Sequence, residues 1–298
     1  MSQKITAKPN QFFIFFWKEI EVVIECNEAL MMSDCARLMA LRPPLVKPSA
    51  SVLIPDIKIT HDHDTANFTV ELTNWPIKAF TQREDQLLYC TLAIGAAFLR
   101  KTKTLVLHAG GFIVEGQAIV FGGASKVGKS TLAYEALKEG LPILGDDMIT
   151  LNPFTHAVEA FPKPLKLRLS QAQNMFGSNE YFTRYEYICG NLEGEERVLL
   201  SRSSPGMLPL EISYPIGALV LLKRNDEYET TIKKLVGLEA ISAGLNQLIG
   251  TQGGSGLGIL KTLQHLLNKQ KIYQLNIGNW GTKNGLNLLL VNLQNQSE

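Results

Sequence analysis

Residues 123–131 carry a complete G-x-x-x-x-G-K-[ST] pattern, and this pattern constrains the fold more than any other feature of the chain. Its glycines allow the backbone to wrap tightly and to point its N–H groups inward. A helix that starts directly after the loop adds its positive N-terminal end, so the whole unit suits phosphate oxygens. Such a loop must therefore lie between a buried strand and a helix. Its residues are Gly123, Ala124, Ser125, Lys126, Val127, Gly128, Lys129, Ser130 and Thr131.

The sequence on both sides of the loop meets this requirement. Residues 117–121 are short, apolar and β-prone, which predicts a buried strand. Residues 131–139 are strong helix formers with apolar residues at helical spacing, and Gly140 is suited to end that helix. Lys129 would reach the β- and γ-phosphates, and the Ser130 hydroxyl would ligate Mg²⁺. The sequence therefore predicts a site for a nucleoside triphosphate; the alternative is a chance match in a surface loop.

Two adjacent carboxylates, Asp146 and Asp147, follow the apolar residues 141–144. Only one helix and one strand fit between Ser130 and Asp146, so we expect this strand to lie beside the loop. Carboxylates there can meet a triphosphate-bound Mg²⁺. One would coordinate the ion and the other would take a proton from an attacking hydroxyl, in an order that the sequence leaves open. The alternative is a polar turn with two solvated acids.

Three further residues are candidates for the same site. His108 follows a predicted strand at 104–107 and precedes an alanine and two glycines, so it can contact the acids or the phosphates, or be a structural histidine. Lys166 and Arg168 alternate along another predicted strand and share one face. They can neutralise phosphate charge, or lie on a solvated strand face.

Composition limits the partners. The chain has 298 residues with 29 basic and 28 acidic side chains, so its charge offers no case for nucleic acid or an anionic membrane. The apolar run at residues 12–17 is too short to span a bilayer and lacks a cleavage site behind it. The four cysteines form no C-x-x-C pair, which favours reduced thiols in a cytoplasmic protein.

Hydrophobic patterning predicts an α/β protein in two parts, a small N-terminal α/β region at 1–82 and a P-loop catalytic domain at 83–298. Residues 170–210 read as a mobile insertion, and residues 250–258 as a flexible hinge or lid. We expect helices at 28–39, 82–101, 131–139, 238–249, 260–270 and 286–295. We expect strands at 12–26, 51–59, 65–72, 104–107, 112–114, 117–121, 141–144, 148–151, 157–161, 165–168, 216–222 and 271–277.

Over about residues 104–151 the chain resembles the HPr kinase/phosphorylase family, whose catalytic domain is similar to that of phosphoenolpyruvate carboxykinase. The likeness rests on the His108 region, the loop, its helix and Gly145-Asp146-Asp147. It implies a mixed-sheet P-loop kinase domain rather than a doubly wound parallel sheet. It also implies serine phosphorylation with ATP and Mg²⁺. Lys129 and Ser130 would then hold phosphates and metal, Asp146 and Asp147 would supply base and metal ligand, and His108 would support them.

The sequence departs from that family at two signatures. Residues 160–168 stand where the family has Glu-(Ile/Val)-Arg-Gly-Leu-Gly, and its C-terminal arginine-rich signature is absent. These departures argue against HPr as the substrate and against the phosphorylase reaction. The chain is more similar to HPr-kinase-like enzymes of peptide-modifying systems, including lasso-peptide precursor kinases. The implied acceptor is a serine of a peptide or small protein. A small-molecule kinase of the same fold and a non-catalytic nucleotide-binding regulatory module are the alternatives, and a homo-oligomer stays open.

Overall fold

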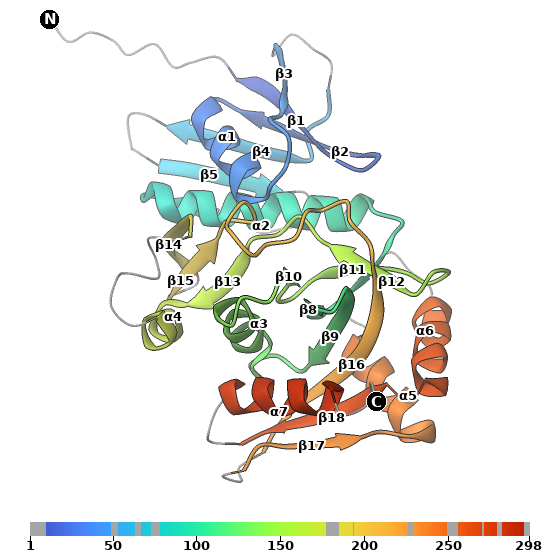
Figure 1. The fold of residues 1–298 in the computed structure, drawn as a ribbon. Helices are drawn as coiled ribbons and strands as arrows, with labels where there is room; N and C mark the ends of the chain where they lie inside the picture. Colours follow the sequence, from blue (N-terminus) through green and yellow to red (C-terminus); the bar gives the residue numbers. More distant parts are fainter. Residues whose placement is uncertain are drawn as a thin grey trace, which may run out of the picture.

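The computed structural model describes residues 10–48, 53–62, 67–72, 78–176, 185–192, 194–225, 229–248, 256–269, 271–278 and 282–294. Within these residues the chain forms three β-sheets with helices between and around them (Figure 1). The long helix α2 (Arg83–Lys101) crosses the molecule between the N-terminal sheet and the rest of the chain (Figure 1). The fold is the mixed α/β arrangement that the sequence predicts.

The N-terminal sheet has six strands in the order β3-β1-β2-β4-β5-β6. Residues 12–26, predicted as one strand, form the hairpin β1–β2, so that prediction is wrong. The polar pair Lys18-Glu19 interrupts the apolar run, and Lys18 adopts a positive φ of 55° that turns the chain. Helix α1 (Ala29–Leu38) packs against α2 beside this sheet. The strands are β1 (Gln11–Trp17), β2 (Ile20–Cys26), β3 (Leu45–Pro48), β4 (Ile57–Asp62), β5 (Asn67–Leu72) and β6 (Lys78–Phe80).

The central sheet has nine strands. Seven of them lie side by side in the order β10-β8-β9-β16-β12-β11-β7, and β18 pairs with both β16 and β17. β9 and β18 both run parallel to β16, whereas β8 runs antiparallel to β9. The sheet is therefore mixed, as expected. Its strands are β7 (Leu105–Leu107), β8 (Ala109–Val114), β9 (Gln117–Gly123), β10 (Ile143–Gly145), β11 (Ile149–Asn152), β12 (Ala157–Ala160), β16 (Tyr214–Arg224), β17 (Thr231–Lys234) and β18 (Ile272–Ile277).

Helices cover both faces of this sheet because its central strands are apolar on both sides. In β9, Ile119 and Phe121 pack with α3 (Lys129–Lys138) and α7 (Thr282–Gln294). Ala118 and Val120 face the opposite core, which contains α5 (Gly237–Leu248) and α6 (Gly256–Asn268). Each large side chain buried in this way contributes about 1.5–3 kcal/mol. The two layers hold β9, and the loop that follows it, in a fixed place.

Residues 165–200 form a third sheet, so the prediction of a mobile insertion at 170–210 is wrong where the chain is described. β15 (Glu195–Leu200) pairs with both β13 (Leu165–Arg168) and β14 (Tyr187–Leu192), and α4 (Leu169–Phe176) follows β13. Leu165 and Leu167 pack in the same core as α3. The charged first half of β15 conceals its strand pattern in the sequence. Residues 177–184 and 193 lie outside the described residues.

The glycine-rich segment at 250–258 is described only from residue 256, where α6 begins. The hinge or lid predicted for residues 250–255 lies outside the described residues. The predicted boundary at residue 82 stays a prediction. Among the helices that the structure describes, none combines the length and apolar character needed to cross a bilayer.

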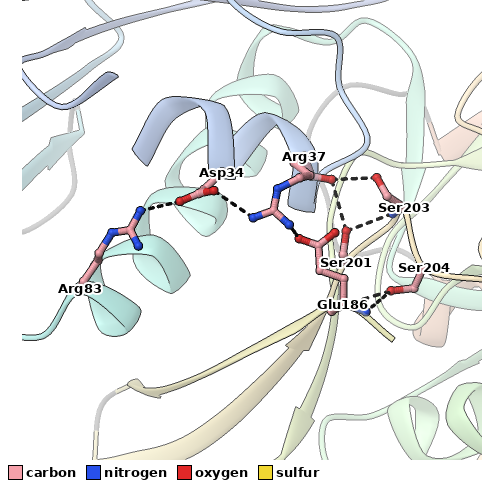
Figure 2. A network of polar contacts seen from close by, with 7 residues as sticks. All are labelled: Asp34, Arg37, Arg83, Glu186, Ser201, Ser203 and Ser204. Atoms are coloured by element: carbon pink, nitrogen blue, oxygen red, sulfur yellow. Dashed lines mark hydrogen bonds and ion pairs between the residues drawn. The ribbon is translucent and has the colours of Figure 1, made fainter. Parts of the chain in front are cut away.

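A polar network joins α1 to the chain segment after β15 (Figure 2). Asp34 accepts hydrogen bonds from Arg37 at 2.9 Å and from Arg83 at 2.6 Å, and Arg37 also pairs with Glu186. The carbonyl oxygen of Arg37 accepts from the hydroxyls of Ser201, at 3.2 Å, and Ser203, at 2.9 Å (Figure 2). The two serine hydroxyls thus bond a carbonyl in the last turn of α1, where intrahelical partners are lacking.

Candidate functional site

The loop lies between β9 and α3, in the order that its pattern requires. Gly128 caps the helix in a left-handed conformation, with φ of 114°, which glycine adopts without a side-chain penalty. Lys129 begins the helix and is 7% exposed. Its Nζ donates to the carbonyl oxygens of Gly123, at 2.7 Å, and Ala124, at 3.1 Å. Burial lowers the pKa of Lys129, and the nearby Asp147 and Asp146 oppose this change.

The acidic pair follows β10, which pairs with β8 rather than with β9. The acid strand and the loop strand are therefore not neighbours in the sheet. The loop and the acids still meet, because β8 runs antiparallel to both of its neighbours. β9 and β10 are therefore parallel to each other. The carboxyl ends of β9 and β10 thus reach the same edge of the sheet.

Asp146 faces the loop. Its side chain is 2% exposed and hydrogen-bonded to the side chain of Ser130. The backbone N–H of Lys166 donates to Asp146 Oδ2 at 3.4 Å. Burial raises the pKa of Asp146, and the adjacent charge of Asp147 raises it further. Of the two acids, Asp146 is therefore the one whose ionised form the protein stabilises less.

Asp147 lies between two basic groups. Its Oδ1 is 2.8 Å from Nε2 of His108, and its Oδ2 accepts a hydrogen bond from Lys163. Burial by itself would raise the pKa of Asp147, but the charge of Lys163 and the contact with His108 outweigh it, and the pKa is lowered. Asp147 is therefore ionised at neutral pH. The structure brings together His108, Asp146 and Asp147 as the sequence proposed.

Lys163 is a site residue that the sequence reading missed. It stands between Pro162 and Pro164, a segment that reads only as a break before β13. Its side chain is 11% exposed and directed at Asp147. The sequence did contain one signal for this residue. Proline restricts its own φ and the conformation of the residue before it, so the two prolines limit the backbone around Lys163 just before a strand.

The loop and the acids border a cavity of about 490 Å³. Lys166 and Arg168 of β13 line it, as their alternation suggested, together with Arg197 of β15 and Arg224 of β16, which were not predicted. A second hollow of about 620 Å³ lies beside the loop and shares His108, Arg224 and residues 125–127 with the first. Among the described residues, the cavity wall is thus predominantly basic, with the two aspartates as its acidic groups.

Arg202 supports the strand that precedes the acids, a role that no pattern in the sequence indicates. It is 3% exposed, and its guanidinium donates to the carbonyl oxygens of Leu144 and Leu208, at 2.8 Å each. Its backbone N–H donates to the carbonyl of Leu38 at 2.8 Å. Burial lowers the pKa of Arg202 to about 10, and Asp146 opposes that change. Arg202 therefore links the end of α1 to the residue two positions before Asp146.

The oxygen set at the loop suits Mg²⁺. Among the described residues, no three or more His, Cys, Asp and Glu side chains form a metal cluster. Mg²⁺ needs no such cage, because it is commonly held by one or two carboxylates together with substrate phosphates. The buried carboxylate of Asp146, bonded to the Ser130 hydroxyl, fits that pattern. Asp147 is the second carboxylate within the same cavity.

Comparison with known proteins adds little to this geometry. No family model matches the chain, and no curated protein is significantly similar to it. Among solved structures, it is similar to the HPr(Ser) kinase/phosphatase from Coxiella burnetii, with 10% identity and a TM-score of 0.32. The similarity covers 65% of this chain and 99% of that one. A match at this level supports no argument about the site, which depends on the residues themselves.

Proposed function

We propose that the chain is a Mg²⁺-dependent kinase that transfers the γ-phosphoryl group of ATP to a hydroxyl group. The proposal depends on one observation. The hydroxyl of Ser130 in the loop is hydrogen-bonded to the buried Asp146, and Asp147 and His108 lie beside it. A nucleotide-binding loop alone needs only phosphate contacts. A loop that also meets two carboxylates and a histidine has the groups that phosphoryl transfer uses.

The loop and helix α3 bind the triphosphate. The N–H groups of residues 124–129 and the N-terminal end of α3 face its oxygens. Lys129 supplies a positive charge at the β- and γ-phosphates. Ser130 and Asp146 are the residues that would hold Mg²⁺, which when bound neutralises charge on the phosphates.

Asp147 takes the proton of the acceptor. Lys163 and His108 keep it ionised, so it can accept a hydrogen bond from the incoming hydroxyl. The acceptor oxygen bonds to the γ-phosphorus as the bond from that phosphorus to the bridging oxygen breaks, and ADP leaves. The hydroxyl proton passes to Asp147. A weak base suffices, because the transition state of phosphoryl transfer is loose and makes small demands on the nucleophile.

The acceptor in this proposal is a serine of a peptide or small protein, within the cytoplasm. The resemblance to HPr-kinase-like enzymes of peptide-modifying systems supports this choice. Incubation with labelled ATP and precursor peptides, and separately with hydroxylated metabolites, identifies the acceptor class. Label in metabolites alone would replace the peptide kinase with a small-molecule kinase.

Replacement of the acids tests the proposal. We expect Asp146→Asn and Asp147→Asn each to lower phosphoryl transfer at least ~10²-fold, because they remove metal coordination and the proton acceptor. The readout is transfer of labelled phosphate, alongside nucleotide affinity and the circular dichroism spectrum. Asp85→Asn, at an acid outside the cavity, is the matched control. Transfer near the wild-type rate in both acid variants would overturn the assignment. Nucleotide binding with no turnover in the wild type would indicate a regulatory module.

A further inference from the structure

The basic side chains of the cavity fall into two groups on different elements. Lys126 and Lys129 belong to the loop and its helix, and Arg224 ends β16 and also borders the second hollow beside the loop. The other group lies on the third sheet. It comprises Lys166, Arg168 and Arg197, none of which lines the second hollow.

Arg168 and Arg197 stand directly opposite each other on the antiparallel strands β13 and β15. Like charges at such positions destabilise a sheet. Glu195 pairs with Arg197 and lies 3.4 Å from Arg168. Among these three described residues, two guanidinium groups and one carboxylate carry a net positive charge.

The arginine pair is displaced from the reacting centre by a short distance. The backbone of Lys166 contacts Asp146, and Arg168 follows two residues later on the same face of β13. Two residues of a strand span roughly 7 Å. The pair therefore lies a short step along β13 from the contact with Asp146, within reach of a group attached near an acceptor hydroxyl.

We infer that Arg168 and Arg197 form a subsite for an oxyanion group of the phosphoryl acceptor, a carboxylate or a phosphate. This inference rests on the proposed kinase function, because it assigns the loop to the triphosphate and the wall formed by the third sheet to the acceptor. Arginine suits the role, since its planar guanidinium binds carboxylate and phosphate oxygens in bidentate fashion. Glu195 then holds the pair in place and competes with the acceptor anion.

Binding of inorganic phosphate to the full chain tests the subsite. The protein is first saturated with Mg²⁺ and a non-hydrolysable ATP analogue, and phosphate is then titrated by calorimetry. We expect phosphate to bind while the nucleotide stays bound. Arg168→Gln and Arg197→Gln should each weaken phosphate binding at least ~10-fold, with nucleotide affinity within about 2-fold of wild type. Arg42→Gln, at an exposed arginine away from the cavity, is the matched control.

Glu195→Gln gives a prediction of opposite sign. Removing the competing carboxylate should strengthen phosphate binding, and the variant should fold normally because Glu195 is substantially exposed. Succinate as a second probe separates the sources: displacement of phosphate by succinate assigns the site to carboxylates, and failure to displace it assigns the site to phosphates. Displacement of phosphate by the nucleotide analogue, or unchanged phosphate affinity in both arginine variants, would overturn the subsite.

The binding assay needs no turnover, so it can contradict the anion subsite without contradicting the kinase function, and the transfer assay can do the reverse. A chain that binds nucleotide and phosphate together but transfers no phosphoryl group would overturn the kinase and keep the anion subsite. A chain that phosphorylates an acceptor but binds no second anion would overturn only the subsite.

Discussion

Asp146 and Asp147 are adjacent and chemically identical, yet their surroundings change their pKa values in opposite directions. Asp146 is buried against the loop, and burial and Asp147 raise its pKa. Asp147 is paired with Lys163 and His108, which lower its pKa despite burial. Pairs of titratable groups with diverging pKa values are typical of sites that divide two chemical tasks between them. The contacts favour Asp146 as the metal ligand and Asp147 as the proton acceptor.

Stability should respond oppositely to the two amide substitutions. A raised folded-state pKa means that ionising Asp146 costs folding free energy at neutral pH, so Asp146→Asn should raise the unfolding midpoint. This gain should shrink as the pH falls through the raised pKa toward the unfolded value of 3.8. Thermal unfolding of the full chain between about pH 7 and about pH 4 measures it. A midpoint below that of the wild type at neutral pH would contradict the prediction.

Asp147→Asn should lower the unfolding midpoint. A lowered folded-state pKa means that ionised Asp147 stabilises the fold at every pH above its unfolded value of 3.8, and that this contribution is lost only as the pH falls further, through the folded pKa. The deficit of the variant should therefore persist, nearly unchanged, from about pH 7 to about pH 5. A deficit that vanished within this range would show that Lys163 and His108 do not hold the carboxylate ionised.

At the scale of residues, the sequence identified groups whose position relative to the loop is local. His108, Asp146 and Asp147 each directly follow an apolar strand, so their place at a strand end could be read from the pattern. Lys163, Arg197 and Arg202 could not be found in this way. They reach the site from segments whose pairing and packing depend on contacts distant in sequence.

At the scale of elements, β8 decides whether the loop and the acids meet. It separates β9 from β10 and approaches both closely through its glycines. A Cβ at Gly110 would lie 2.3 Å from the ring of Phe121 and 2.8 Å from the carbonyl oxygen of Gly145. Both distances are far below van der Waals contact, so β8 tolerates no side chain at this position. The Ala-Gly-Gly start of this strand is thus a packing requirement.

Gly110→Ala should therefore destabilise the fold by about 1–3 kcal/mol, the usual cost of overpacking a core. Urea unfolding of the full chain is the measurement. Gly95→Ala is the matched control, since a Cβ there meets nothing within 4 Å inside helix α2. That variant should gain about 0.5–1 kcal/mol from helix propensity. Equal effects of the two substitutions would show that the close approach of β8 does not limit the fold.

At the scale of the whole molecule, two kinds of polar contact connect α1 with the chain around the central and third sheets. Arg37 makes exposed ion pairs with Asp34 and Glu186 (Figure 2). The guanidinium of Arg202 donates buried hydrogen bonds to the carbonyls of Leu144 and Leu208, and its backbone N–H donates to Leu38 at the end of α1. Exposed pairs contribute little because water and salt screen them, whereas buried carbonyls that lose their donor are costly. The buried arginine should therefore dominate the connection.

Arg202→Met should cost about 2–6 kcal/mol, since two buried carbonyl groups lose their hydrogen bonds. Arg37→Gln should cost less than about 1 kcal/mol. Urea unfolding compares the two variants. Arg202→Lys, which keeps the charge, should recover part of the stability but lower phosphoryl transfer more than nucleotide affinity, because the end of β10 is held less firmly. Equal costs for Arg37→Gln and Arg202→Met would contradict this division.

The sequence by itself determined the loop, its flanking strand and helix, and the local place of the two acids. These features depend on backbone conformation and on periodicity over a few residues, which neighbouring side chains control directly. It also predicted a mixed α/β fold, through the resemblance at residues 104–151.

Only the tertiary structure decided that β10 reaches the loop across β8, that residues 187–192 and 195–200 form strands, and that Arg197, Lys163 and Arg202 meet around the acids. Strand order and the convergence of distant basic groups follow from which apolar faces bury one another. The strand order depends on the sum of long-range packing energies over the whole chain, so no local sequence pattern predicts it.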